Sequence, residues 1–148
     1  MYRPEYDPDI FFHWKTLSVR FRDLDPLNHV NNSVFNTYFE EARIDFIHHV
    51  PEMKASMNEG KSFILAHLEM DYVSPVYSGE RVIVGSSMKE LGNSSVKGIQ
   101  ALYTESTKKL NAVCETTGVW FDLQRNRPAR LPEISNPGQY LFKMNKNG

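Results

Sequence analysis

The sequence predicts an α+β domain in which one long helix lies against a five-stranded antiparallel sheet. Three observations support this fold class: apolar residues at helical spacing in the first third, alternating apolar runs in most of the rest, and short polar turns between those runs. The expected order is one strand, the helix and a meander of four strands. At 148 residues the chain is expected to form a single domain over 1–148.

The helix is expected from Ser33 to about His49. Its apolar positions are spaced by four, three and four residues, with Tyr38 beside them: Phe35, Phe39, Ala42 and Phe46. Seventeen residues give a length of about 25 Å, and Pro51 is expected to end the helix. An aromatic face of this width needs a large apolar partner, and a sheet provides one.

The strands are expected at 10–21, 63–72, 81–91, 96–104 and 112–121, with "SPVYSGE", "GNSS" and "TKKLN" as turns. Residues 1–9 are expected to form an irregular arm and 123–148 an irregular C-terminal tail. An open sheet leaves edge strands, and pairing with a second copy is one way to protect them. We therefore expect a homodimer, with a homotetramer as the alternative assembly.

Composition excludes several function classes. The net charge of −1 carries no basic excess of the kind that binds nucleic acid. The apolar runs are too short to span a membrane, and the N-terminus lacks the pattern of a secretory signal. Cys114 is the single cysteine, so no internal disulfide can form. These features predict a soluble cytoplasmic protein.

The stretch before the helix, "RFRDLDPLNHVNNS", gathers the polar residues that suggest a site. Asp25 precedes a proline, and from the residues alone a turn-capping role is favoured over a catalytic one. Asn31, Asn32 and Ser33 are strong N-cap residues, and the free amides of a helix start also stabilise negative charge.

A metal site is a further alternative for this stretch. Asp23, Asp25 and His29 are suitable ligand types, although a hydrated loop is the more usual explanation for such an aspartate. His48 and His49 are poor partners for each other, because helix neighbours point about 100° apart.

Three stretches in order resemble one family: "VRFRDLDPLNHVNNSVFNTYFEEARIDF", "LEMDYVSPVYSGERVIV" and "WFDLQRNRPARLPE". Together they are similar to the hotdog-fold acyl-CoA thioesterases of the 4-hydroxybenzoyl-CoA thioesterase group, over roughly residues 17–133. The resemblance implies a long helix wrapped by a curved sheet, and a dimer with active sites at its interface. The implied reaction is hydrolysis of an acyl thioester of coenzyme A, less often of acyl carrier protein.

The resemblance also implies roles for residues. It makes Asp25 the catalytic carboxylate, as nucleophile or general base, and places the oxyanion hole at the backbone amide of Asn32. His29 would position the loop or polarise the carbonyl, unless it is structural. Tyr38 and Phe39 would line the acyl pocket, although aromatic residues at this spacing are usually core. No metal ion or redox cofactor is implied, and coenzyme A enters as part of the substrate.

Two other functions remain open on the sequence. One is a hotdog protein that binds an acyl thioester without hydrolysing it. The other is a hotdog hydratase or dehydratase, which typically pairs a histidine with an acid on a differently patterned loop. Asn28 stands where relatives often have glycine, which leaves the backbone shape of this loop open.

Overall fold

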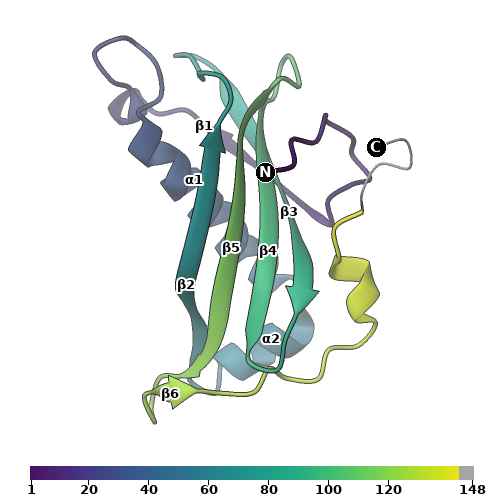
Figure 1. The fold of residues 1–148 in the computed structure, drawn as a ribbon. Helices are drawn as coiled ribbons and strands as arrows, with labels where there is room; N and C mark the ends of the chain where they lie inside the picture. The colour runs from purple at the N-terminus through teal and green to yellow at the C-terminus, as the bar shows by residue number, and fades with distance from the viewer. Residues whose placement is uncertain (144–148) are drawn as a thin grey trace.

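A computed structural model describes residues 1–143 of the chain (Figure 1). The helices and strands are β1 (His13–Ser18), α1 (Asn32–His48), α2 (Pro51–Met57), β2 (Lys61–Tyr72), β3 (Arg81–Leu91), β4 (Ser95–Thr104), β5 (Leu110–Asp122) and β6 (Arg127–Pro128). Short 3-10 helices lie at Phe21–Asp23 and Pro137–Tyr140. The curved sheet lies across one side of α1, which is the hotdog fold and confirms the predicted fold class.

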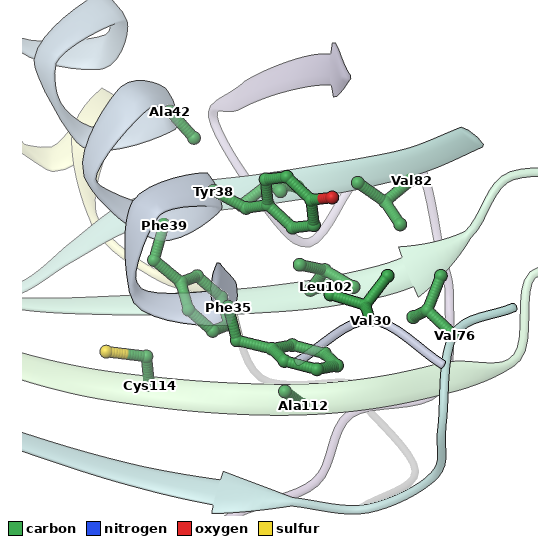
Figure 2. Packing of buried hydrophobic residues seen from close by; sticks show 11 residues of the cluster. Val30, Phe35, Tyr38, Phe39, Ala42, Val76, Val82, Leu102, Ala112 and Cys114 are labelled. Carbon is green, nitrogen blue, oxygen red and sulfur yellow. The ribbon is translucent and has the colours of Figure 1, made fainter. Parts of the chain in front are cut away.

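The long helix α1 forms where its apolar spacing predicted. Its buried positions are Phe35, Tyr38, Phe39, Ala42 and Phe46, the face expected to meet the sheet. Figure 2 shows several of these side chains packed against Val82, Leu102, Ala112 and Cys114 of the strands. Burial of this face is the main stabilisation of the helix, since propensity alone contributes little. The prediction of a helix against a sheet is confirmed.

The strand order corrects one prediction. The sheet runs β1-β3-β4-β5-β2, with antiparallel neighbours, and the short β6 pairs with β5. β3, β4 and β5 form the expected meander, but β2 pairs with β5 and not with β3. The error has a simple cause: alternation indicates which face of a strand is buried, but not which strand lies beside it.

The region after α1 differs from expectation in a second way. Pro51 lies three residues beyond the end of α1 and occupies the first turn of a second helix, α2. Proline is favoured there because the first helical amide has no partner in the helix. The first strand is also shorter than 10–21, because the chain turns into a 3-10 helix at Phe21.

The ends of the chain cover other surfaces. The arm before β1 places Ile10 and Phe11 against Ile99 and Tyr103, on the sheet face away from α1. Residues 123–143 contain β6 and the second 3-10 helix, and the rest of the predicted tail, 144–148, lies outside the described residues.

Neither α1 nor α2 combines the length and apolar run that a membrane-spanning helix needs.

Candidate active site

The polar stretch before α1 folds into a small hairpin. Leu24 and Val30 form an antiparallel bridge. Between them, the Asp25 amide donates to the His29 carbonyl at 2.8 Å, and the Asn28 amide donates to the Asp25 carbonyl at 3.0 Å. Asn28 has φ +66°, in the left-handed region that asparagine tolerates better than most residues. Asn28 therefore takes a conformation that also suits glycine, the residue that the family resemblance implies at this position.

The connection between β2 and β3 holds this hairpin in place. The Val30 amide donates to the Val76 carbonyl at 2.8 Å, and His29 forms a bridge with Tyr77. The His29 and Tyr77 rings meet edge to face with centroids 4.9 Å apart. Because Val76 is fully buried, the hairpin is anchored in the core while its tip faces outward.

Asp25 lies at the tip of the hairpin and is half-buried. Its Oδ1 accepts from the Leu27 amide at 2.9 Å and from the His29 amide at 3.2 Å. Its Oδ2 has no hydrogen-bond donor among residues 1–143. The turn-capping role expected from the residues is thus present, and it occupies one oxygen while leaving the other available.

Asp23 has a different environment. It is buried, and its carboxylate accepts from Tyr38 Oη at 2.7 Å, from the Arg20 amide at 2.9 Å and from Arg20 Nη2 at 2.9 Å. Burial acts to raise the pKa of Asp23, but the hydrogen bonds from Arg20 and Tyr38 outweigh it and lower the pKa below its usual value. Both oxygens of the Asp23 carboxylate are thus occupied by hydrogen-bond donors, and this charged group serves the structure of the loop.

The start of α1 contributes backbone N–H groups to the candidate site. Asn31 is the N-cap: its Oδ1 accepts from the Ser33 amide at 3.0 Å. The Asn32 amide is the first of the helix, belongs to an exposed residue, and has no acceptor among residues 1–143. Tyr72 at the end of β2 donates to the Asn32 carbonyl at 3.2 Å and ties the sheet to this point. An unpaired amide at the positive end of a helix dipole is suited to stabilise an anion.

Tyr38 and Phe39 lie in the hydrophobic core between α1 and the sheet (Figure 2). Phe39 has no exposed surface, and the Tyr38 hydroxyl is occupied by Asp23. Packing therefore accounts for both residues, and their contact with an acyl group stays a prediction.

The alternative metal site of Asp23, Asp25 and His29 does not form, because the three side chains do not point to one place. Asp23 turns inward to Arg20 and Tyr38, while Asp25 caps its own loop.

A cavity of about 70 Å³ lies farther along α1, between the helix and the sheet. Its lining is mostly apolar, and includes Phe46, Phe63 and Met88. At its polar end, Arg43 donates to Gln100 Oε1 at 3.2 Å. Burial lowers the pKa of Arg43. Arg43 follows Asn32 by eleven residues, or about 16 Å of helix, so this cavity is separate from the Asp25 loop.

The sequence reasoning did not anticipate the partners of Asp23. Arg20 and Asp23 are three residues apart, and Tyr38 comes from the second turn of α1. The reciprocal contacts of Arg20 and Asp23 resemble a capping box, with the Asp23 carboxylate on the Arg20 amide. That spacing was the one local signal that Asp23 serves structure.

Comparisons with known proteins place the chain. A protein-family model described as the thioesterase-like superfamily matches residues 19–135. A thioesterase from Thermus thermophilus, whose crystal structure was determined with coenzyme A and Zn, is 38% identical with a TM-score of 0.72 over 84% of this chain and 94% of that one.

Two curated relatives are also similar to this chain. The chloroplastic acyl-acyl carrier protein thioesterase ATL3 of Arabidopsis thaliana is 27% identical over 124 residues, which are 82% of this chain and 64% of that protein. The uncharacterized protein YsmA of Bacillus subtilis is 31% identical over 100 residues, 63% of this chain and 67% of that protein. This chain thus spans less than two thirds of the Arabidopsis protein.

The narrower assignment to the 4-hydroxybenzoyl-CoA thioesterase group stays a prediction. The family match covers the hairpin, α1 and all the long strands of the sheet, and the structural match covers most of both chains. The chain belongs to the thioesterase-like superfamily.

Proposed function

We propose that this protein hydrolyses an acyl-CoA to the free acid and coenzyme A. The observation that carries the proposal is the Asp25 carboxylate, which is held by two amides on one oxygen and open on the other, in the hairpin that precedes a helix start with a free amide. A carboxylate held beside a thioester carbonyl can attack that carbon or activate a water molecule. Neither route needs a metal ion or a redox cofactor.

The second part of the site is the Asn32 amide. Attack on the thioester places negative charge on the carbonyl oxygen, and a preorganised N–H at the positive end of α1 stabilises that charge. The intermediate then collapses with loss of the coenzyme A thiolate. When water is the nucleophile this step gives the free acid; when Asp25 is the nucleophile it leaves a mixed anhydride, which water hydrolyses to the free acid and the restored carboxylate. His29 acts by position: its amide donates to Asp25 Oδ1, and its ring against Tyr77 fixes the turn.

Coenzyme A is the proposed acyl carrier. The Thermus thermophilus relative was crystallised with coenzyme A, which supports this choice. The Arabidopsis relative is named for acyl carrier protein, so acyl carrier protein is the competing donor. The location of the reaction in the cytoplasm stays a prediction.

We further propose a homodimer joined through β2. This strand is one edge of the sheet, is twice as long as β1 at the other edge, and exposes Ile64 and Leu65. A free apolar edge favours pairing with a second copy. Light scattering should give about twice the chain mass of 17.1 kDa. Ile64→Lys should shift the protein toward monomer. A monomeric wild type would contradict the assembly, and four chains would show that dimers pair.

The activity test is thiol release across a panel of acyl-CoA substrates and matched acyl carrier protein thioesters, for the wild type and Asp25→Asn. We expect turnover of one acyl class by the wild type and a loss of at least about a hundredfold in Asp25→Asn. Binding of acyl-CoA without turnover would assign a non-hydrolytic binding protein. Water addition to an enoyl thioester would assign a hydratase.

The oxyanion role has its own test at Asn32. Asn32→Pro removes the amide hydrogen, and proline is well tolerated at the first helical position. Asn31 has φ −60° and ψ 136°, a conformation compatible with a following proline. We expect kcat to fall by about 10²- to 10³-fold. The matched control, Asn32→Ala, keeps the amide and should keep the activity. Equal activity in both variants would remove Asn32 from the mechanism.

A further inference from the structure

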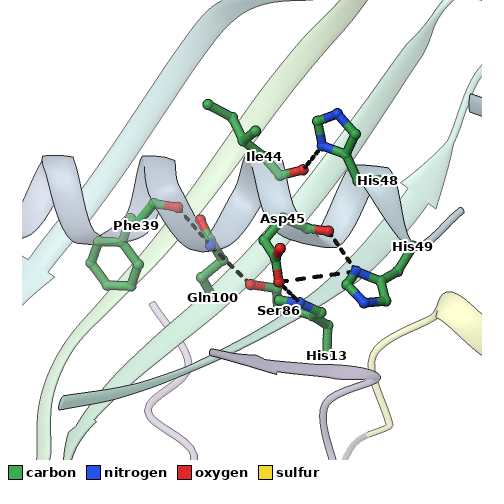
Figure 3. Close-up of polar contacts among 8 residues, drawn as sticks. All are labelled: His13, Phe39, Ile44, Asp45, His48, His49, Ser86 and Gln100. Atoms are coloured by element: carbon green, nitrogen blue, oxygen red, sulfur yellow. Dashed lines mark hydrogen bonds and ion pairs between the residues drawn. The ribbon is translucent and has the colours of Figure 1, made fainter. Parts of the chain in front are cut away.

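The far end of α1 carries a polar cluster that the proposed hydrolysis does not use. His13 comes from β1, Asp45 lies in the last turn of α1, and His49 is the C-cap residue of that helix (Figure 3). His13 Nε2 is 2.7 Å from Asp45 Oδ2, and His49 Nδ1 is 4.0 Å from the same oxygen. One nitrogen or oxygen of each side chain lies within 4.8 Å of the others.

The cluster joins the buried layer to the surface. The His13 side chain is 6% exposed, whereas those of Asp45 and His49 are 36% and 58% exposed. An ion therefore has a path from solvent on the helix side. Burial outweighs the hydrogen bond to Asp45 and lowers the pKa of His13. Neutral imidazole and ionised carboxylate are the forms that bind metal ions.

We propose that His13, Asp45 and His49 bind a divalent transition-metal ion, with Zn²⁺ as the best match. Two imidazole nitrogens and one carboxylate oxygen are common Zn²⁺ ligands, and a water molecule completes the tetrahedron. With bonds of about 2.0–2.2 Å, neighbouring ligand atoms lie roughly 3.3 Å apart. The separations of 2.7 and 4.0 Å bracket this value, so small side-chain rotations bring the three atoms into range.

Two hydrogen bonds give way when the ion enters. One joins His13 to Asp45, and the other joins His49 Nδ1 to the Asp45 main-chain oxygen at 2.7 Å. Each ring then carries its proton on the other nitrogen. For His13 that atom is Nδ1, which is buried and has no partner within residues 1–143 in either tautomer. Moving the proton to Nδ1 therefore breaks no further hydrogen bond of the His13 ring.

The site would act as a clamp between an edge strand and the end of the long helix. Asp45 follows Asn32 by thirteen residues, or about 20 Å along α1, so the ion lies away from the Asp25 loop. Binding to the folded chain and not to the unfolded one stabilises the fold. This inference is independent of the proposed hydrolysis.

The test is Zn²⁺ binding by the untagged full chain after removal of metal, measured by competition with a chromophoric chelator and by thermal unfolding. We expect one ion per chain and a Zn²⁺-dependent rise in Tm. His49→Ala removes one ligand and leaves the bond between His13 and Asp45, and it should weaken binding at least tenfold. His48→Ala is the matched control, because His48 makes the same helix contact, to the Ile44 carbonyl at 2.8 Å, and points away from the cluster.

A second variant separates binding from folding. Asp45→Asn keeps an acceptor for His13 but removes the charge, and it should also weaken binding at least tenfold. Circular dichroism checks that each variant is folded, and His49→Gln replaces His49→Ala if alanine disrupts the helix. The inference is overturned if the wild type binds no stoichiometric ion. It is also overturned if the His49 and Asp45 variants bind as the wild type does, which would place the ion at exposed groups such as His67 and Glu69.

Discussion

Asp23 and Asp25, separated by one residue, hold their carboxylates in different surroundings. Asp23 is buried and receives donors from Arg20 and Tyr38 on both oxygens. Asp25 is half-buried, receives two amides on one oxygen, and keeps the other without a donor among the described residues. A saturated carboxylate cannot attack or take a proton without losing its partners, whereas an open oxygen can do both. We therefore expect Asp23 to contribute to stability and Asp25 to contribute to the chemistry.

The largest effect is expected on the activity, from substitution of Asp25. Asp25→Asn should lower kcat/KM by at least about a hundredfold, equivalent to about 2.7 kcal/mol of transition-state stabilisation. Its free energy of unfolding should fall by no more than about 1 kcal/mol, because Asp25 is only half-buried and an asparagine Oδ1 still accepts from both amides, although more weakly. Thiol release and urea unfolding measure the two quantities. A large loss of stability with activity intact would reverse the assignment.

The opposite pattern is expected at the other aspartate. Asp23→Asn should lower the free energy of unfolding by about 2 kcal/mol, because hydrogen bonds to a charged acceptor are replaced by weaker ones. Activity per folded molecule should stay within a few fold of the wild type at 25 °C. Thiol release and urea unfolding again measure the two quantities. A hundredfold loss of activity in a stable Asp23→Asn protein would make both aspartates part of the reaction.

The pH dependence sharpens this contrast. The pKa of Asp23 is lowered in the folded state, so the ionised group stabilises the fold above its unfolded pKa, near 3.9. The stability difference between wild type and Asp23→Asn should be constant above about pH 5 and shrink as the pH falls below about 4. Urea unfolding from pH 3 to pH 7 measures it. A difference that grows toward low pH would contradict the assigned direction.

The smallest effect is expected at the N-cap. Asn31→Ala should cost about 1 kcal/mol, because the Ser33 amide loses its acceptor. Asn32→Ala is the control: its side chain makes no hydrogen bond among the described residues, so its cost should be a few tenths of a kcal/mol. Thermal and urea unfolding compare the two. Equal costs would mean that Asn31 is not the cap that starts α1.

Much of the architecture followed from the sequence because it depends on local spacing. The apolar positions of α1 lie at the intervals of a helical face, and the Gly92–Ser95 hairpin has short-range turn chemistry. The polar loop was also identified: the capping role of Asp25 follows from its neighbours in the chain, whereas its catalytic role was implied by the family resemblance. Its capping role is present in the structure, and its catalytic role stays a prediction.

What sequence could not determine depends on contacts between distant residues. The place of β2 beside β5, the Tyr38 hydroxyl on Asp23, and the meeting of His13 with Asp45 all join segments at least fifteen residues apart. The four-residue spacing of Asp45 and His49 was a local signal, but a third ligand from β1 required the fold. Local spacing thus determined the helix, most of the strands and the polar loop of this protein. Tertiary structure completed the contrast between the two carboxylates, because the Tyr38 hydroxyl reaches Asp23 only when α1 packs against the segment that precedes it, whereas the Arg20 donors are local.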